Sequence, residues 1–508
     1  MGRARITAFV SLLALVVAGC GSRVVPLSVP QVVGTGPFVN PTTGETINPT
    51  VGPTTGTTNG PVATPPVAIG NPNCVPGAKP TDTGVTKDTI KLGLIASITG
   101  PLPGQFNAAV EAVDTYFRMV NALGGICKRR VQLIIRDDNG DGRQNERVAT
   151  KLATEDKVFA FVGSLSAPND KGIGKLSRQY KIPDIGFPLT YERTESPYSY
   201  GVPGQLQRRL IGVNASGSGY LNKQNGVKQI AIFWLKDSLV SVLNAWAFES
   251  AMQKATGNGL RVCHEQETGI LDNNFKQYVV RMQSNCDPAN GPVAVYSVME
   301  NNSNIKLAQA MHGQGFKPKI FAPTFSSYLP SFIQQGGQAV EGAYIAMPQI
   351  PFERCGRDSR GRPAAPCSHP ELNRYVSALQ RYRPNYIAPG SWGAPGWGQA
   401  ELFTQAAAAC GATLTRACVL KQLNTMGLFS SNGFLSPTRP RDHVIYAADL
   451  VVQVRGGKFV EIRPTDKGGP PGAPDFWDRS VIFDWQDYYC NNKPHFPNTD
   501  EKDQFINC

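Results

Sequence analysis

Short apolar runs alternate with longer amphipathic stretches from about residue 85 onward, and this alternation restricts the fold more than any other feature of the chain. Four runs have the length of buried strands and begin at Ile90, Val131, Val158 and Ile182. The clearest helical stretch between them stops at Gly124 and has an apolar face made of Phe106, Ala109, Val110, Val113, Phe117 and Val120. Such a strand–helix–strand series predicts a parallel sheet with helices on both faces.

The same alternation begins again in the middle of the chain. Apolar runs starting at Lys228, Val293 and Lys319 are separated by helical stretches near residues 238–256, 275–283 and 304–312. We therefore predict an α/β protein of two doubly wound, Rossmann-like lobes, each with its own core. Open α/β sheets bind ligands beyond the carboxyl ends of their strands, so a ligand cleft is expected between the lobes.

The N-terminus has the pattern of an export signal. Arg3 and Arg5 precede an apolar stretch that is too short to span a membrane comfortably, and the stretch ends in LVVAGC at Cys20. This order resembles the bacterial lipobox. We expect residues 1–19 to be a lipoprotein signal peptide, and the lipid on Cys20 to anchor the protein on the extracytoplasmic face of the cell membrane. An ordinary secretory signal is the alternative.

Residues 20–83 are rich in Pro, Gly, Thr, Val and Asn and carry almost no charge. A segment with so little apolar periodicity cannot bury enough surface to offset the entropy of ordering, so it predicts a flexible tether.

Cysteine usage agrees with export. Eleven cysteines less Cys20 leave ten, an even number that predicts disulfides outside the cytoplasm. Proximity in the sequence favours the pairs Cys263–Cys286, Cys355–Cys367, Cys410–Cys418 and Cys490–Cys508, and elimination leaves Cys74–Cys127. Zinc is the competing interpretation, but the sequence has neither C-x-x-C nor a histidine at ligand spacing from a cysteine pair.

Several segments together carry a family resemblance. In chain order they are IKLGLIASITGPLPGQ, NALGGI, the strand that runs into Asp137-Asp138, FVGSLSAP, YKIPDIGF, GVKQIAIFW and DHVIYAADLVVQVRGGKFV. From about Val85 to Gly457 the chain resembles the leucine/isoleucine/valine-type extracytoplasmic solute-binding proteins of ABC importers. The resemblance implies the type I periplasmic-binding-protein fold, whose discontinuous lobes are joined by three crossovers.

On this resemblance, the crossovers lie near Val202, Met347 and Asn432. Lobe 1 then comprises residues 84–202 plus 348–432, and lobe 2 comprises residues 203–347 plus 433–508 with a C-terminal extension. The positions that align with the family's ligand contacts are Gln105, Phe106, Ser166, Ala167, Pro188, Thr190, Leu239, Glu300 and Thr324.

The resemblance also implies how a ligand is held. Ser166 and Thr190 would bind a ligand carboxylate. Amino-acid binders usually carry an acidic residue for the ligand's ammonium group, but this chain has Ala322-Pro323-Thr324-Phe325 there, and Leu239 takes the position of a tyrosine. Two hypotheses stay open: Glu300 replaces the missing carboxylate, or the ligand has no ammonium group.

Other classes of function have weaker support. Asp137 to Gly142 match the opening of a calcium loop, but Val148 stands where a bidentate Glu is needed. The five histidines are scattered and no G-x-S-x-G or H-E-x-x-H motif occurs, so we expect no enzyme activity, metal or cofactor. The formal net charge of +12 is dispersed, and export argues against nucleic acid as a partner.

These features together predict a lipid-anchored receptor that delivers a small molecule to the permease subunits of an ABC importer. The expected ligand is an amino acid of the branched-chain type or a related small polar solute. A ligand-sensing ectodomain that acts with a membrane signalling partner is the alternative.

Overall fold

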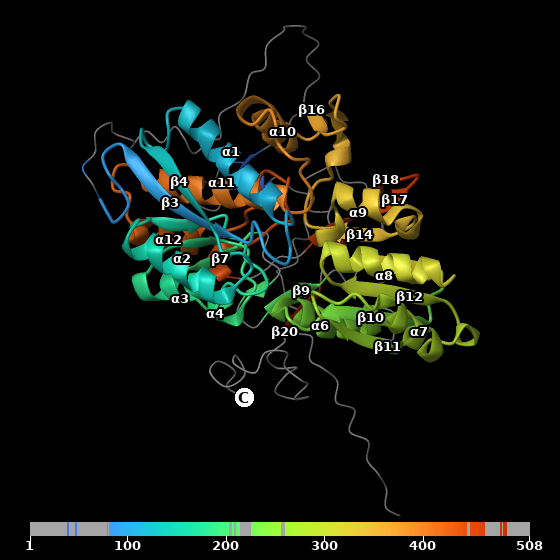
Figure 1. Ribbon diagram of the computed structural model, residues 1–508. Coiled ribbons are helices and arrows are strands. Elements are labelled where there is room, and N and C mark those ends of the chain that lie inside the picture. The colour runs from blue at the N-terminus through green and yellow to red at the C-terminus, as the bar shows by residue number, and fades with distance from the viewer. Residues whose placement is uncertain are drawn as a thin grey trace, which may run out of the picture.

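Two lobes, each built on a parallel sheet, make up the folded body in the computed structural model (Figure 1). The structure describes residues 79, 81–202, 225–255, 260–443 and 448–462, together with short strand segments at 38–39, 46–47, 206–207, 210–213, 478–479 and 481–484. No helix in these segments is long and apolar enough to cross a bilayer.

The first lobe contains a five-stranded parallel sheet in the order β4-β3-β5-β6-β7. Its strands are β3 (Thr89–Ala96), β4 (Arg130–Asp137), β5 (Ala160–Val162), β6 (Asp184–Gly186) and β7 (Ser199–Gly201). Leu94 packs into the larger core and its neighbour Ile95 into a separate cluster with Leu152 and Ile173, as the alternation of side chains along a strand requires. Both faces of this sheet are therefore covered.

Helices from two distant parts of the chain cover the first sheet. The earlier ones are α1 (Asn107–Ala122), α2 (Gly142–Thr154), α3 (Lys171–Tyr180) and α4 (Tyr191–Thr194), and the later ones are α10 (Pro370–Tyr382), α11 (Gly393–Ala409) and α12 (Arg416–Thr425). α1 packs along α11 and α10, and α11 also contacts β5 and β6. The orange helices accordingly lie among the blue elements in Figure 1.

The second lobe contains a four-stranded parallel sheet in the order β11-β10-β12-β13. Its strands are β10 (Gln229–Leu235), β11 (Arg261–Thr268), β12 (Val293–Val298) and β13 (Ile320–Pro323). Its helices are α6 (Leu239–Ala255), α7 (Phe275–Asn285), α8 (Asn301–Gly313) and α9 (Pro330–Gly336). Every described residue of β10 and β12 is buried, which explains their uninterrupted apolar sequences.

Late segments extend the second lobe with antiparallel strands. β14 (Tyr344–Met347) pairs with β17 (Ala448–Arg455), which also pairs with β18 (Lys458–Ile462) and β19 (Asp478–Arg479). β20 (Val481–Asp484) pairs with β9 (Leu210–Val213), and β9 pairs with β8 (Leu206–Gln207). Part of the C-terminal extension therefore joins strands that belong with the second lobe.

The remaining elements are short. β1 (Phe38–Val39) pairs with β2 (Thr46–Ile47) inside the segment predicted to be a tether, and β15 (Cys355–Arg357) pairs with β16 (Pro363–Cys367). The 3₁₀ helices are η1 (Pro288–Asn290), η2 (Phe325–Ser327), η3 (Gly337–Val340), η4 (Phe352–Arg354) and η5 (Pro440–Asp442).

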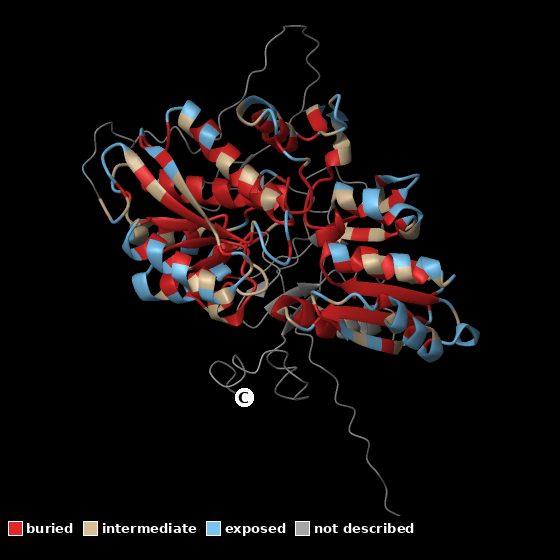
Figure 2. Cartoon of the chain, in the orientation of Figure 1, coloured by how far each residue is buried: buried red, intermediate tan, exposed pale blue. Residues whose placement is uncertain are grey.

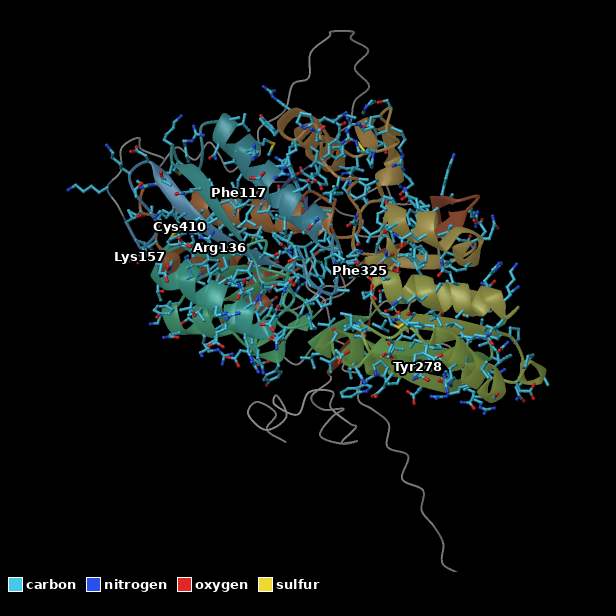
Figure 3. The ribbon with its side chains drawn as sticks, viewed as in Figure 1. Phe117, Arg136, Lys157, Tyr278, Phe325 and Cys410 are labelled. Atoms are coloured by element: carbon cyan, nitrogen blue, oxygen red, sulfur yellow. A yellow bond between two sulfur atoms is a disulfide. The ribbon has the colours of Figure 1, made fainter. Side chains whose placement is uncertain are left out.

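The predicted fold class is confirmed, since two parallel sheets each lie between helices. Buried residues concentrate in the strands and on the inward faces of the helices, and exposed residues lie at the rim of each lobe (Figure 2). Phe117 and Cys410 lie in the first lobe and Tyr278 in the second (Figure 3). Trp397 and Tyr116 are fully buried in the first-lobe core, where their ring centroids lie 4.7 Å apart.

Three predicted disulfides are confirmed: Cys263–Cys286, Cys355–Cys367 and Cys410–Cys418. Cys127 is also disulfide-bonded. Its predicted partner Cys74 lies outside the described residues, as do Cys20, Cys490 and Cys508, so these predictions stay untested.

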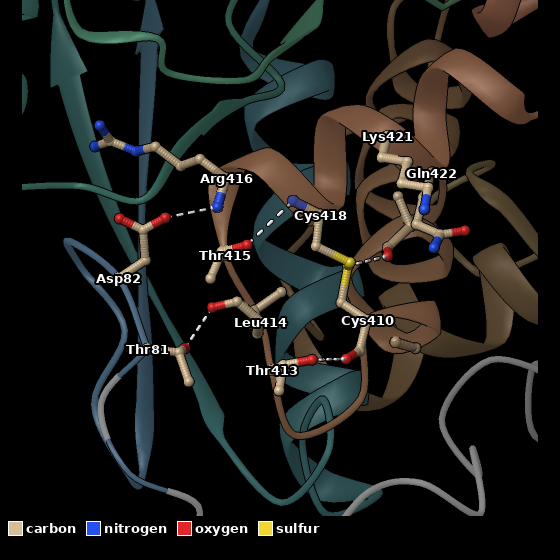
Figure 4. The surroundings of a disulfide bond; sticks show 12 residues. Thr81, Asp82, Cys410, Thr413, Leu414, Thr415, Arg416, Cys418, Lys421 and Gln422 are labelled. Carbon is tan, nitrogen blue, oxygen red and sulfur yellow. Dashed lines mark hydrogen bonds between the residues drawn. A yellow bond between two sulfur atoms is a disulfide. The ribbon is translucent and has the colours of Figure 1, made fainter.

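The Cys410–Cys418 disulfide joins the end of α11 to α12 where the start of the folded body is attached (Figure 4). The side chain of Thr415 caps α12 by accepting a hydrogen bond from the Cys418 N–H at 3.1 Å. The Asp82 carboxylate accepts the Arg416 N–H at 2.6 Å, and Thr81 donates to the Leu414 carbonyl. Residues more than 300 positions apart are thereby fixed together.

Candidate functional site

The predicted first-lobe residues lie at one edge of the first sheet. Gln105 and Phe106 precede α1, the pair Ser166-Ala167 follows β5, and the segment Pro188–Thr190 follows β6. β3, β5 and β6 are neighbours in a parallel sheet, so their carboxyl ends meet at this edge. Gln105, Phe106, Ser166 and Thr190 are all buried. The structure thus brings these positions together, as the strand-end argument predicted.

A buried arginine holds the loop after β6. Both Arg193 and the carboxylates of Asp170 and Asp184 have fully buried side chains. Arg193 donates two hydrogen bonds of 2.7 Å to Asp184 and one of 2.9 Å to Asp170. Its guanidinium also donates to the carbonyls of Ser164 and Phe187, which follow β5 and β6. The guanidinium therefore fixes the backbone of two loops at the site.

The hydroxyl of Thr190 is hydrogen-bonded within the same network. Thr190 donates to Asp170, which also accepts the Leu189 N–H at 2.9 Å. Burial raises the pKa of Asp170, while Arg193 and these hydrogen bonds act in the opposite direction. Thr190 would have to leave Asp170 before its hydroxyl could hold a ligand carboxylate. Its predicted ligand role stays a prediction.

The serines after β3 and β5 also bond within the first lobe. Ser166 Oγ lies 3.3 Å from the carbonyl of Ile95, to which it donates. Ser97 Oγ lies 2.8 Å from an oxygen of Asp138 and accepts the N–H of Ala167 at 3.1 Å. These hydroxyls stabilise the strand ends, so a ligand would compete with existing contacts for Ser166.

Asp137 and Asp138 act as loop-forming residues. Asp137 accepts the Ile98 N–H at 3.1 Å and the Asn139 N–H at 2.8 Å, and Asp138 accepts from Asn145 at 2.9 Å. Hydrogen bonds to its charged form lower the pKa of Asp137 against the opposing effect of burial. No group of acidic, histidine or cysteine side chains within the described segments could hold a metal ion.

The predicted second-lobe residues lie at the carboxyl edge of the second sheet. Glu300 follows β12 and Thr324 follows β13, the adjacent strand, whereas Leu239 begins α6 after β10. Thr324 Oγ1 donates to the carbonyl of Met299 at 2.7 Å, and this carbonyl precedes Glu300 directly. Leu239 is 3% exposed and forms part of the core.

Glu300 caps a helix. Its carboxylate accepts the Ser303 N–H at 2.7 Å and the N–H of Asn302, both in the first turn of α8. These bonds satisfy donors that a helix N-terminus leaves open, and the helix dipole favours the negative charge there. An ammonium group at Glu300 would share a carboxylate that already has two partners. The proposed ammonium contact stays a prediction.

Two hydrogen bonds cross between the site edges. The amide of Gln105 donates to the carbonyl of Ser326 at 3.3 Å, and the N–H of Ser391 donates to the carbonyl of Tyr328 at 2.9 Å. A hollow of about 500 Å³ is also lined from both lobes, by Pro103, Asn302, Ile305, Lys306, Gln309 and Gln335. The two lobes are therefore in contact beside the predicted ligand positions.

Four aromatic side chains, here called the aromatic quartet, meet at this boundary: Phe106, Phe187, Phe325 and Trp392. The Trp392 ring centroid lies 5.4 Å from that of Phe106, 4.9 Å from that of Phe187 and 4.6 Å from that of Phe325. Phe325 belongs to η2 of the second lobe and lies where the two lobes meet (Figure 3). Each ring is at least nine-tenths buried.

Sequence reasoning identified Phe106 but missed the other three members of the quartet. Phe187 and Phe325 each lie one residue from a predicted position, at the ends of β6 and β13. Trp392 immediately precedes α11, about 200 residues after Phe187, and only the return of the chain to the first lobe places it here. Aromatic residues directly after apolar strands were the available signal for the first two.

A second buried charge cluster lies beside the predicted crossover near Asn432. Arg374 bonds to Glu371 and lies 3.2 Å from Glu401, while Asn432 donates to Glu371 and Ser431 donates to Glu401. Burial, reinforced by the negative charge of Glu371 and opposed by Arg374, raises the pKa of Glu401 to about 7. Ser431, beside the predicted crossover, is thus bonded to a carboxyl group whose pKa of about 7 lies near neutral pH.

Comparison with known proteins gives both a family and related structures. A family model described as periplasmic binding protein matches residues 89–458. No curated protein matches the chain. A fatty acid ABC transporter substrate-binding protein from Thermomonospora curvata is similar in structure, with a TM-score of 0.59, 18% identity, and coverage of 78% of this chain and 98% of that one.

Two amino-acid transport proteins are similar to about the same extent. The leucine-binding protein LivK from Thermotoga maritima has a TM-score of 0.58 and 16% identity, covering 74% of this chain and 98% of that one. LivJ from Streptococcus pneumoniae, a branched-chain amino acid transporter substrate-binding protein in complex with isoleucine, has a TM-score of 0.56 and 15% identity, covering 74% and 100%. At such identities the likeness concerns the fold.

Proposed function

Because this chain belongs to the periplasmic binding protein family, we propose that it is a solute receptor that binds a small molecule between its lobes and delivers it to an ABC importer. The observation that carries the proposal is the match over residues 89–458, which includes both parallel sheets and the strand ends that meet at the lobe boundary. Membership of a family of binding proteins agrees with the expectation that the chain is not an enzyme.

Lobe closure would combine binding with signalling to the permease. A permease needs to distinguish loaded from empty receptor, and a ligand that contacts both lobes shifts the receptor towards its closed form. We propose that lobe 1 comprises residues 84–202 plus 348–432 and lobe 2 residues 203–347 plus 433–508. The return of α10–α12 to the first sheet and the pairing of β14 with β17 support this division.

We further propose that the receptor is an extracytoplasmic lipoprotein. Cys20 would carry the lipid, and residues 20–83 would tether the folded body to the membrane. The LVVAGC sequence supports this anchor, and the three disulfides support export to an oxidising compartment.

Two classes of solute have relatives in this fold. The names of the similar proteins include amino-acid receptors and a fatty acid receptor, so either class is a candidate for this chain. Ser166, Thr190 and Glu300 already have hydrogen-bond partners in the protein, whereas the rings of the aromatic quartet supply apolar surface.

Two measurements test the proposal. Mass spectrometry identifies the solute that the protein retains after gentle purification. Uptake of that solute, labelled, is then compared between cells with and without the gene. Deletion should abolish uptake, and the intact gene should restore it. If uptake continues unchanged while a transcriptional response to the solute disappears, the alternative of a sensing ectodomain replaces the transport function.

A further inference from the structure

We propose that the solute has a flat apolar body and a hydrogen-bond-accepting oxygen, and that it binds against the aromatic quartet with this oxygen at the indole N–H of Trp392. This inference rests on the proposed function, since it specifies the class of solute for the same site.

We infer that the solute has an apolar body because the two lobes both contribute rings to the quartet. Phe106, Phe187 and Trp392 come from three connections of the first lobe, and Phe325 comes from the second lobe. Phe325 contacts Trp392 at 4.6 Å and Phe187 at 6.2 Å between ring centroids. Both ring pairs are tilted, at interplanar angles of 60° and 51°, and such aromatic pairs stabilise the contact beyond the area they bury. A planar solute that enters as the lobes separate would replace these contacts with similar ones to both lobes.

We infer that the solute has an accepting oxygen because two buried donors at this site lack hydrogen-bond partners among the described residues. Trp392 is 6% exposed, and its indole nitrogen has no hydrogen-bond partner among the described residues. The hydroxyl of the adjacent Ser391, which is fully buried, also lacks one. An indole N–H can only donate, and leaving a buried donor unpaired is unfavourable. A solute oxygen beside Trp392 would satisfy it.

The carboxylates of Glu300 and Asp170 already have hydrogen-bond partners within the protein. Glu300 caps α8, and Asp170 is paired with Arg193 and bonded by Thr190. A buried charge of either sign is costly unless it is hydrogen-bonded, and an anionic oxygen would have the donors of Trp392 and Ser391, which are unpaired among the described residues. A quaternary ammonium held by ring faces is the rival chemistry for an aromatic cage. The unpaired indole donor favours an acceptor over a cation.

Calorimetry on the full chain, freed of any retained solute, separates these chemistries with three probes: benzoate, leucine and glycine betaine. Benzoate carries a ring and accepting oxygens, leucine carries an ammonium group, and betaine carries a quaternary cation. Benzoate should bind, and the other two should bind at least about tenfold more weakly.

Variants then test the individual contacts. Trp392→Phe keeps a ring but removes the donor and should weaken benzoate binding by about tenfold or more. Phe325→Leu should weaken it by about threefold to tenfold through loss of a ring contact. Phe403→Leu is the matched control, because Phe403 is buried among Phe117 and Phe159 in the first-lobe core, and it should leave benzoate affinity unchanged. Thermal melting of each variant checks folding.

The outcomes separate this inference from the proposed function. Benzoate binding that is unchanged in Trp392→Phe overturns the donor role of Trp392. Binding of leucine or betaine in preference to benzoate overturns the solute class but leaves the receptor function intact. Failure of all three probes also overturns the solute class, and the solute retained on purification then decides the receptor function. The probe comparison uses the unmodified chain, so it does not depend on the folding of any variant.

Discussion

Arg193 connects the candidate site to the first-lobe core through a single buried side chain. It pairs with Asp170 and Asp184 and bonds to the carbonyls of Ser164 and Phe187, which shortly precede the predicted ligand positions Ser166 and Pro188. Buried ion pairs of this kind contribute little net stability, yet removal of one partner leaves uncompensated charge. The positions of the site loops therefore depend on a residue that no solute would need to touch.

Replacement of Arg193 by Met should lower the free energy of unfolding by about 3–5 kcal/mol, because two buried carboxylates lose their counterion. Urea denaturation measures the change. Arg118→Met is the matched control: Arg118 pairs with Asp114 on the surface with its side chain 55% exposed, and its loss should cost less than about 1 kcal/mol. Similar costs for the two variants would contradict the structural role of Arg193.

Glu401 should make stability depend on pH. Its folded-state pKa of about 7 lies above the ordinary value, so the folded protein keeps a proton that the unfolded chain releases. This contribution is fully present below about pH 4.3 and is lost as pH rises through 7. Between pH 5 and pH 8 it should fall by about 2–3 kcal/mol.

The measurement compares urea unfolding of the parent and Glu401→Gln across this range. The comparison matters because burial lowers the pKa of His369 to about 4, and that group's contribution changes in the opposite sense, being lost as pH falls. Glu371, Arg374 and Tyr116 face Glu401 and remain in both proteins. Glu155→Gln, which alters an exposed carboxylate, is the control. Identical pH profiles for the parent and Glu401→Gln would exclude the role of Glu401.

Strands with strong apolar runs could be predicted from the sequence, including β4 and β13 at sheet edges, whereas β11 could not. The runs beginning at Ile90, Val131 and Val293 became β3, β4 and β12. β11, Arg261–Thr268, was not predicted because only His264 and Thr268 of its sequence RVCHEQET are buried. Burial on both faces produces the apolar runs, and β11 lacks that signal because most of its residues are not buried.

The candidate site, too, could be predicted only in part. Strand-end positions were identified because parallel strands place them at one edge, but hydrogen-bond partners were not. Thr190 pairs with Asp170 and Glu300 caps α8, and either result depends on side-chain directions that the apolar pattern does not encode. Trp392 lies at the site because a later part of the chain, α11, returns to pack on the first sheet.

The disulfides should differ in their contribution to stability according to loop length. Replacement of both Cys263 and Cys286 by Ser opens a separation of 23 residues, and replacement of both Cys410 and Cys418 opens one of 8. The chain-entropy relation gives about 3 kcal/mol for the first and roughly 1 kcal/mol less for the second. Urea unfolding of the two double variants tests the order, and non-reducing peptide mapping of exported protein tests the pairings. Recovery of these four residues as free thiols would contradict the framework.

At the scale of the whole molecule, the folded body and the proposed membrane anchor lie in separate parts of the chain. The start of the folded body is fixed to α12 through Thr81 and Asp82, so the preceding segment leaves from the first lobe. The proposed anchor at Cys20 therefore lies at least about 60 residues from this attachment in the sequence. We therefore expect the folded body to bind solute without the proposed lipid.

Cys20→Ser should abolish lipid modification and leave the protein unprocessed or released to the medium, because only a thiol accepts the lipid. Cell fractionation and intact-mass measurement check both effects. Cys74→Ser, a cysteine-to-serine change beyond the signal, is the control and should preserve membrane attachment. Normal processing and retention of Cys20→Ser would rule out the proposed anchor.

The two hydrogen bonds between the site edges end on peptide carbonyls, those of Ser326 and Tyr328. Every residue type supplies such a carbonyl, so no substitution at positions 326 or 328 removes the acceptor itself. During divergence of this sequence, side chains around the boundary can change while these acceptors persist. The acceptor side of this contact between the lobes is thus insulated from mutation, while the side chains of the proposed solute site, the aromatic quartet included, can change.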